Sequence, residues 1–492
     1  MLRVKYQCSR PVCPGKYPAR TSVAIGLGLW LLTANGVNAP LEDTIPQQTT
    51  VAISSLQIQD EAQLENQRTL YLEAEQALKS NRREQFKQLL PQLKNYPLYS
   101  YLQYKYYRGQ LHHLDDAQIE AFLAANGNSV IGERFRYEVL KHFARKQQWA
   151  QLIKYYQPQY SISLQCHYLT ALLQTGQQSK ALAEAEALWL VGHSQPKTCN
   201  TLFDAWEQAG YRNNDLNWKR IDLSMARSNI SLARHIAKAL PSTDQKLVEQ
   251  WINIHRKPEL VTRLRIDPSH HAREYDIVLH AIKRQSRKDP AEAAKLWRKL
   301  EQKYTFTDSE RYPIYRYIGL ALARQHHADA DLWLSQIPEE HADDHVRQWK
   351  LRSTIRHGQW SELVTTIENL PPKQQSEFTW QFWWAYANEQ LGNAVEAEGI
   401  YRYLANHRHY YGFLAADRLN LPYAFEDKPL EISDEELASL NQYPEVQRAR
   451  ELYKLDKILD ARREWYQLTE TLSTRQKLAA ARLAQQWDWH DR

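Results

Sequence analysis

Histidine pairs are the residues of this chain whose spacing best suits metal chemistry. His341 and His345 lie four residues apart, which places two imidazoles on one face of a helix. His341 is not followed by the Glu that a zinc protease uses as its base, and acidic residues flank the pair. We interpret this stretch as a charged turn between helices. The pairs His326-His327 and His270-His271 have the same interpretation, so the sequence predicts no metal site.

Enzyme motifs are absent from the sequence. It holds no glycine-rich phosphate loop, no Gly-x-Ser-x-Gly turn and no zinc-binding cysteine set. Acidic pairs are abundant, but none is set apart by a special loop. The sequence therefore predicts no cofactor and no catalytic residue, and an enzyme with a site hidden among its helices is the least supported interpretation.

A basic segment and a tyrosine cluster are the best candidates for a binding surface. Residues 251–300 contain 12 Lys and Arg against 6 Asp and Glu, together with four His, and tyrosines gather in residues 96–107. Aromatic rings stack on sugar faces, and Arg and Lys bind carboxylates. The alternatives are a solvated helix face and large side chains that fill the space between helices. The residues singled out for glycan binding are Tyr99, Tyr101, Tyr104, Arg284, Arg287 and Lys288.

Residues 1–39 have the organisation of a secretory signal peptide. Five basic residues precede an apolar run over residues 22–33, which is too short for a stable membrane helix. Val37-Asn38-Ala39 offers a small-x-small cleavage site, with a cut after Ala34 or a retained anchor as the alternatives. We therefore expect an exported chain with no stable membrane span after signal removal, which begins with a flexible lead-in over residues 40–61.

The net charge of the chain belongs largely to this leader. The whole sequence has 63 Lys and Arg against 57 Asp and Glu, a net charge of +6. Without the five basic residues of the leader, 58 basic residues face 57 acidic ones, which leaves +1. A chain so nearly neutral lacks the basic excess of a general nucleic-acid binder, and we predict no nucleic-acid partner.

Cys166 and Cys199 are the one cysteine pair outside the leader. Their spacing of 33 residues is close to the period of the helical repeat described below. An exported chain meets an oxidising environment, so we predict a disulfide that links two neighbouring repeats.

A repeat of about 34 residues organises these features. Gly176 and Gly210 lie 34 residues apart, and so do Gly358 and Gly392; the clearest copies lie in residues 349–404. Each glycine separates two segments with the apolar period of a helix. This pattern is typical of tetratricopeptide-like helix pairs, which must stack on their neighbours to bury their apolar faces.

The fold class predicted for the chain is therefore all-α: a superhelical, ring-like solenoid of helix pairs over residues 62–425, then a short helical linker domain over residues 426–492. An acidic change in composition after Pro422 marks the boundary, and Ser433-x-x-Glu436 is a capping box that opens a new helix. Helices are expected over residues 446–455, 461–468 and 475–487. The chain stops soon after an apolar run, so we expect a truncated linker domain.

Several short segments make the chain similar to a known family. It resembles the N-terminal, non-catalytic part of the soluble lytic murein transglycosylases of the Gram-negative periplasm. The segments that carry the resemblance are Tyr96-Pro97-Leu98-Tyr99, Tyr101-Leu102, Leu188-Trp189-Leu190, Ser194-Gln195-Pro196, Cys199, His409-Tyr410-Tyr411-Gly412, Ala415-Ala416, Arg418-Leu419, Pro444-Glu445, Arg448, Arg450-Glu451-Leu452 and Glu464-Trp465.

The resemblance implies a long superhelix closed into a ring, a linker domain and a lysozyme-like catalytic domain. In the family, the catalytic domain cleaves the MurNAc–GlcNAc β-1,4 bond of peptidoglycan without water and forms a 1,6-anhydro end. Its Gly-Leu-Met-Gln and Ala-Tyr-Asn-x-Gly runs do not occur in this sequence. We therefore expect no catalytic domain in this chain and assign the family's catalytic Glu to no residue.

The sequence thus predicts a periplasmic scaffold from a lytic transglycosylase, a carbon–oxygen lyase, that is inactive alone. Its expected partners are peptidoglycan glycan strands, with cell-wall synthesis proteins or a separate catalytic domain as further candidates. The alternative is a periplasmic protein–protein adaptor of tetratricopeptide-like repeats.

Overall fold

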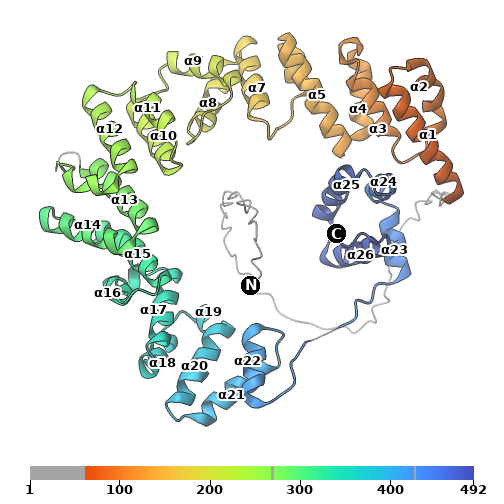
Figure 1. Ribbon diagram of the computed structural model, residues 1–492. Coiled ribbons are helices and arrows are strands. Elements are labelled where there is room, and N and C mark those ends of the chain that lie inside the picture. Colours follow the sequence, from red (N-terminus) through yellow and green to blue (C-terminus); the bar gives the residue numbers. More distant parts are fainter. Residues whose placement is uncertain (1–60, 128, 268–270, 426–427) are drawn as a thin grey trace, which may run out of the picture. The chain divides into compact units, whose positions relative to one another are not determined.

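Paired helices follow one another along the chain (Figure 1). The computed structural model describes residues 61–127, 129–267, 271–425 and 428–492. The predicted signal peptide and nearly all of the predicted lead-in fall outside these residues. Within the described ranges every regular element is a helix, which confirms the predicted all-α fold.

The first half of the described chain runs to the helix that carries Arg284 and Arg287. Its α-helices are α1 (Glu61–Lys79), α2 (Arg83–Leu89), α3 (Tyr99–Arg108), α4 (Asp116–Asn126), α5 (Val130–Lys146), α6 (Trp149–Tyr155), α7 (Ile162–Gln174), α8 (Gln178–Trp189), α9 (Asn200–Gln208), α10 (Asn214–Ala226), α11 (Ile230–Ala237), α12 (Ser242–Arg256) and α13 (His271–Lys288).

The second half continues with helices of similar length. They are α14 (Pro290–Lys303), α15 (Asp308–Arg324), α16 (Ala330–Ser335), α17 (Asp344–Arg356), α18 (Trp360–Glu368), α19 (Pro372–Gln375), α20 (Phe378–Gln390), α21 (Ala394–Ala405), α22 (Tyr410–Leu419), α23 (Asp434–Asn441), α24 (Pro444–Lys454), α25 (Ile458–Thr471) and α26 (Thr474–Gln486). Short 3-10 turns connect some of them: Leu90–Leu93, Leu111–His113, Lys197–Cys199, Pro258–Arg263 and Glu339–His341.

Glycine makes the tight turn inside each of the clearest helix pairs. Gly176 lies between α7 and α8, and Gly392 lies between α20 and α21, with φ values of 81° and 90°. Gly210 and Gly358 occupy the same place in their pairs, at 78° and 65°. A left-handed residue ends one helix and lets the chain reverse, and glycine adopts that conformation without a Cβ clash. The 34-residue spacing therefore reports a repeated helix–turn–helix unit.

Gln147 makes the same turn without glycine. It lies between α5 and α6 with φ of 56°, followed by Gln148 and Trp149 as Gly358 is followed by Gln359 and Trp360. The α5–α6 pair is thus a further copy of the repeat, in which a non-glycine residue holds the left-handed conformation at a cost in stability.

Most helices pack on their neighbours in sequence, as in α7 with α8 and α20 with α21, which is the order of a solenoid. The largest apolar core spans residues 166–346 and includes the fully buried Trp297. None of the helices within the described ranges combines the length and the apolar character needed to cross a membrane.

The C-terminal helices share an apolar core with the N-terminal ones. Leu437, Val446 and Trp465 lie in the same buried cluster as Phe86 and Phe135. The capping box and the helices predicted for this part of the chain are present. Ser433 and Glu436 cap the start of α23 reciprocally, and α24, α25 and α26 match the three expected helices.

A disulfide joins Cys166 to Cys199, as predicted. Cys166 lies in α7, and Cys199 lies directly before α9, so the bond links one helix pair to the start of the next. Both cysteines are fully buried within the large apolar core. The bond closes a loop that contains all of α8, which restricts the unfolded chain and stabilises this part of the solenoid.

Candidate functional site

Tyr101 and Tyr104 are buried, so the glycan-binding role predicted for these two residues is wrong. Tyr101 is 2% exposed and donates a 2.7 Å hydrogen bond to Glu464. Tyr104 is 4% exposed, and the guanidinium carbon of Arg134 lies 5.3 Å from its ring centroid. A sugar cannot reach rings that other helices cover. Tyr99 is half-buried and packs against the same core.

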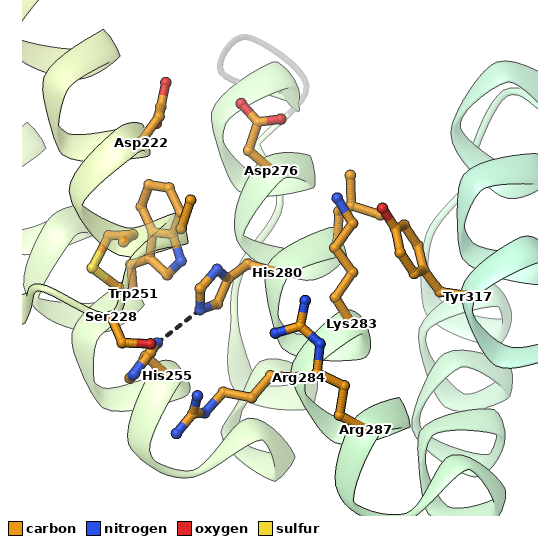
Figure 2. Close-up of a pocket in the computed structure, with 13 residues that line it drawn as sticks. Asp222, Ser228, Trp251, His255, Asp276, His280, Lys283, Arg284, Arg287 and Tyr317 are labelled. Atoms are coloured by element: carbon orange, nitrogen blue, oxygen red, sulfur yellow. Dashed lines mark hydrogen bonds between the residues drawn. The ribbon is translucent and has the colours of Figure 1, made fainter. Parts of the chain in front are cut away.

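The basic segment contains a cavity that brings two of the predicted residues together. Arg284 and Arg287 of α13 line a space of about 340 Å³ between α10, α12, α13 and α15 (Figure 2). That volume lies at the lower end of the range for small-molecule sites. Lys288 lies next to Arg287 but does not line the cavity, because the helix turns it away from the face that carries Arg284. Lys288 therefore lies outside the candidate cavity.

The polar face of α13 positions the cavity's side chains. Asp276, His280, Lys283, Arg284 and Arg287 recur at three- and four-residue intervals, which places them on one side of the helix. The opposite face is apolar and fully buried. Its residues are Ile277, Val278, Ala281 and Ile282. Burial of this apolar face fixes the rotation of α13 and so directs the polar stripe into the cavity.

Two histidines meet at the base of the cavity. His255 of α12 and His280 of α13 share a 2.9 Å hydrogen bond between Nδ1 and Nε2. Burial, the adjacent His255 and Arg284 lower the pKa of His280 to about 4, and burial lowers the pKa of His255. Both rings are therefore neutral at pH 7. When His255 donates the shared proton, Nδ1 of His280 carries a hydrogen toward the cavity.

The cavity has an acidic end and a basic end, which Figure 2 shows at opposite sides of the view. Asp222 of α10 and Asp276 of α13 form the acidic end. Burial raises the pKa of Asp222 to about 6 and also raises the pKa of Asp276. Asp222 accepts a 3.2 Å hydrogen bond from Arg273, so this end holds a cation of its own.

The basic end holds cations without carboxylate partners. Lys283, Arg284 and Arg287 make no ion pair with any residue of the described ranges. The ammonium of Lys283 lies 4.5 Å from the ring centroid of Tyr317, a cation–π contact, and its charge also acts on Asp276, where it opposes the effect of burial on the pKa of that carboxyl. Arg284 and Arg287, together with Lys283, give this end of the cavity a positive potential that favours an anion.

Metal ions do not suit this arrangement. Two of the ring nitrogens are already bonded to each other, and cationic side chains surround them. In the part of the chain that the structure describes, no group of three or more His, Cys, Asp or Glu residues is placed to hold a metal ion. The ring of His341 instead packs against Tyr312, with centroids 4.8 Å apart.

Sequence reasoning missed most of the cavity's lining. It included His255 and His280 in the basic segment but gave them no role, and it overlooked Lys283, Trp251 and Tyr317. The polar stripe along α13 was a signal that could have found Lys283 and His280. Trp251 and Tyr317 come from other helices, and only tertiary packing brings them to α13.

The chain is similar in sequence to known proteins. A family model described as the soluble lytic murein transglycosylase L domain matches residues 439–492. The soluble lytic murein transglycosylase of Escherichia coli (strain K12) is 26% identical over 434 residues, which cover 87% of this chain and 66% of that protein. The protein of the same name from Salmonella typhimurium (strain LT2) is 26% identical over 435 residues, with the same coverage. The chain therefore spans about two thirds of the length of these relatives.

The solved structures that resemble this chain are also lytic transglycosylases, like its relatives by sequence. An inactive mutant of the lytic transglycosylase Slt from Pseudomonas aeruginosa superposes with a TM-score of 0.75 at 30% identity, over 85% of this chain and 69% of that one. The 70-kDa soluble lytic transglycosylase of Escherichia coli gives a TM-score of 0.72 at 24% identity, over 87% of this chain and 70% of that one. The second match shows a shared fold alone.

Proposed function

Because the chain belongs to the soluble lytic murein transglycosylase family, we propose that residues 62–492 form a periplasmic scaffold that holds peptidoglycan glycan strands. In the family, such strands are cleaved between MurNAc and GlcNAc with formation of a 1,6-anhydro end. The observation that carries the scaffold role is the cluster of unpaired cations at the cavity on α13. Peptidoglycan carries carboxylates on its peptide stems, and these cations complement them.

We further propose that these 492 residues do not cleave glycan alone. The family's Gly-Leu-Met-Gln and Ala-Tyr-Asn-x-Gly runs do not occur in the sequence. The cavity on α13 contains neutral histidines, cations and the carboxylates of Asp222 and Asp276. We assign the role of the family's catalytic Glu to none of these groups. We also propose that the domain boundaries lie after residues 39, 61 and 425. The leader over residues 1–39 is removed on export.

A pull-down on purified sacculi tests the scaffold role. The mature chain, beginning at Pro40, is expected to sediment with sacculi and to release no anhydro-muropeptides into the supernatant. Release of anhydro-muropeptides by the purified chain would show that it carries an active site. Absence from the pellet would contradict the scaffold role.

A protein–protein adaptor remains the second candidate function, because aromatic side chains are exposed near α22. Tyr410, Tyr423 and Phe425 are 66%, 44% and 58% exposed, and the rings of Tyr423 and Phe425 contact Phe413 and each other. Exposed apolar clusters of this kind are typical of protein contact sites. A chain that binds no sacculus but whose binding to a purified cell-wall synthesis protein depends on Tyr410 and Phe425 would favour the adaptor.

A further inference from the structure

Hydrogen-bond donors predominate at one end of the α13 cavity. The indole N–H of Trp251 has no hydrogen-bond partner in the described chain, although the side chain is 4% exposed. Figure 2 shows this nitrogen on the edge of the ring that faces His280, and the two ring centroids are 5.6 Å apart. A buried donor without a partner is costly and marks a place where a ligand acceptor can bind.

His280 supplies a second donor beside the indole. Its Nε2 is bonded to His255, while its Nδ1 makes no hydrogen bond with the residues that the structure describes. With His255 as the donor in that pair, Nδ1–H of His280 is free to donate. The two neutral donors therefore come from adjacent helices, α12 and α13; the Trp251 side chain is buried and the His280 side chain is half-buried.

The cations add charge to these donors. Lys283, Arg284 and Arg287 extend from α13 beside His280, and none of them forms an ion pair with a residue that the structure describes. At the other end, Asp222 is already paired with Arg273. The basic end of the cavity therefore favours a ligand with a negatively charged group.

The shape of the cavity limits what carries that negative group. Its walls include the apolar side chains of Met225 and Leu279 together with the rings of Trp251 and Tyr317. A space of about 340 Å³ admits a small residue rather than a chain of sugar rings. A small residue with a free carboxylate and a short apolar side chain fits this cavity. Its carboxylate accepts hydrogen bonds from the donors, and its side chain packs against the apolar walls.

We propose that the cavity between α10, α12, α13 and α15 binds the free C-terminal carboxylate of a peptidoglycan peptide stem. Arg284, Arg287 and Lys283 hold the carboxylate, with the indole of Trp251 and Nδ1–H of His280 as neutral donors. The small apolar residue that bears the carboxylate packs against Trp251 and Tyr317. This inference rests on the proposed scaffold function and assigns a ligand group to it.

The consequence is that the scaffold distinguishes strands by their peptides. A strand whose stems end in a free carboxylate binds in the cavity, whereas a peptide-free strand has no group for it. Amidation of the carboxylate removes the charge and places an NH₂ donor against a site built of donors. The amide is therefore rejected as well as less attracted.

Titration calorimetry with matched soluble probes tests the proposal. The probes are N-acetylmuramyl tetrapeptide with a free C-terminal carboxylate, the same compound as the C-terminal carboxamide, the N-acetylglucosamine tetramer and inorganic phosphate. Because a charge-assisted hydrogen bond contributes roughly 1.5–3 kcal/mol, the acid is expected to bind at least about 10-fold more tightly than the amide. The glycan tetramer and phosphate are expected not to compete with it.

A double variant and its matched control locate the effect. Arg284→Gln with Arg287→Gln is expected to reduce the preference for the acid to less than about twofold. Lys288→Gln with Lys299→Gln removes the same charge from exposed positions outside the cavity and is expected to keep the preference. Circular dichroism and thermal unfolding check that each variant is folded.

The outcomes separate the two proposals. Retention on sacculi without a preference for the acid, or with a preference that survives Arg284→Gln and Arg287→Gln, overturns the carboxylate site and leaves the scaffold role standing. Displacement of the acid by phosphate at equal concentration shows a general anion site and also overturns it. Loss of sacculus retention in the unaltered chain contradicts the scaffold role itself.

Discussion

The hydroxyl of Tyr101 donates a 2.7 Å hydrogen bond to the carboxylate of Glu464, which lies 363 residues further along the chain. The other oxygen of Glu464 accepts a 2.9 Å hydrogen bond from Nε of Arg448. Glu464 is fully buried, and its burial raises the pKa of its carboxyl group. A tyrosine expected to face a ligand thus fastens the C-terminal helices to the N-terminal ones.

Equivalent contacts surround this pair. Glu451 accepts hydrogen bonds from Tyr96 at 2.8 Å and from Arg68 at 2.8 and 2.9 Å. Because these groups are removed from water, each must keep its partner for the interface to remain stable. Most of them belong to the short segments by which the sequence resembles its family.

Removal of the Glu464 charge should destabilise the chain. Glu464→Gln leaves Arg448 with Glu445 as its one carboxylate partner, so we expect a loss of about 3 kcal/mol in the free energy of unfolding. Tyr101→Phe should cost about 2 kcal/mol, because it removes one hydrogen bond to a charged group. Urea unfolding followed by circular dichroism measures both values.

Tyr106→Phe is the control for these variants, because the structure gives its half-buried hydroxyl no hydrogen bond within the described residues. It should change the free energy of unfolding by less than about 0.5 kcal/mol. If Glu464→Gln were as mild as Tyr106→Phe, the buried pair would not stabilise the contact between the two ends of the described chain.

The disulfide between Cys166 and Cys199 should contribute substantially to stability. Their sequence separation of 33 predicts a loss of about 3–4 kcal/mol when the bond is removed, from the entropy that the unfolded chain gains. The variant Cys166→Ala with Cys199→Ala should therefore unfold at lower urea than the oxidised chain. Adding a reductant should shift the unaltered chain in the same direction and leave the variant unchanged. Equal midpoints for all samples would show that the bond is dispensable.

The left-handed turns predict opposite effects for two substitutions. Gln147 holds a φ of 56°, and glycine adopts that conformation without strain, so Gln147→Gly should stabilise the chain by about 1 kcal/mol. Gly392→Ala should destabilise it by about 1 kcal/mol, because its φ is 90° while nothing lies within 4 Å of the added methyl group. Thermal unfolding measures both. Melting-temperature shifts of the same sign would show that the backbone φ angle does not determine how these two substitutions change stability.

His280 and Asp222 should change stability with pH in opposite directions. The pKa of His280 is lowered from 6.5 to about 4, so the unfolded chain binds a proton first and stability is lost as pH falls through this window. The pKa of Asp222 is raised from 3.8 to about 6, so the folded chain binds a proton first and stability is gained over that fall. In the unaltered chain the two effects partly cancel.

Single substitutions separate these effects. His280→Gln removes the loss, so its stability relative to the unaltered chain should rise from pH 7 to pH 4. Asp222→Asn removes the gain, so its relative stability should fall over the same range. Melting temperatures at several pH values provide the comparison. Parallel profiles for the two variants would contradict the burial of these groups as the cause.

Local patterns predicted the fold well. The glycine turns, the cysteine pair and the capping box at Ser433 depend on residues close in sequence or on a fixed repeat period, so periodicity and turn chemistry suffice to find them. The order of the helices follows from the same signals. The resemblance to the family rested on short segments, and the structure explains several of them as partners across one interface.

The candidate site was less predictable. Whether Tyr101 and Tyr104 face solvent depends on helices more than 300 residues away, and nothing local in the sequence encodes that contact. The cavity joins four helices, of which α13 alone carries a visible polar stripe. Arg284 and Arg287 were found because charge composition is local. Trp251 and Tyr317 required the tertiary structure.

Equilibrium binding of the mature chain to purified sacculi tests the central claim most directly. The unaltered chain should sediment with sacculi in a saturable manner, and Arg284→Gln with Arg287→Gln should raise the Kd about 10-fold, a loss of about 1.4 kcal/mol. Lys288→Gln with Lys299→Gln should leave the Kd unchanged. Equal binding by all three chains, or no binding by the unaltered one, would contradict a peptidoglycan scaffold that binds its strands at the cavity on α13.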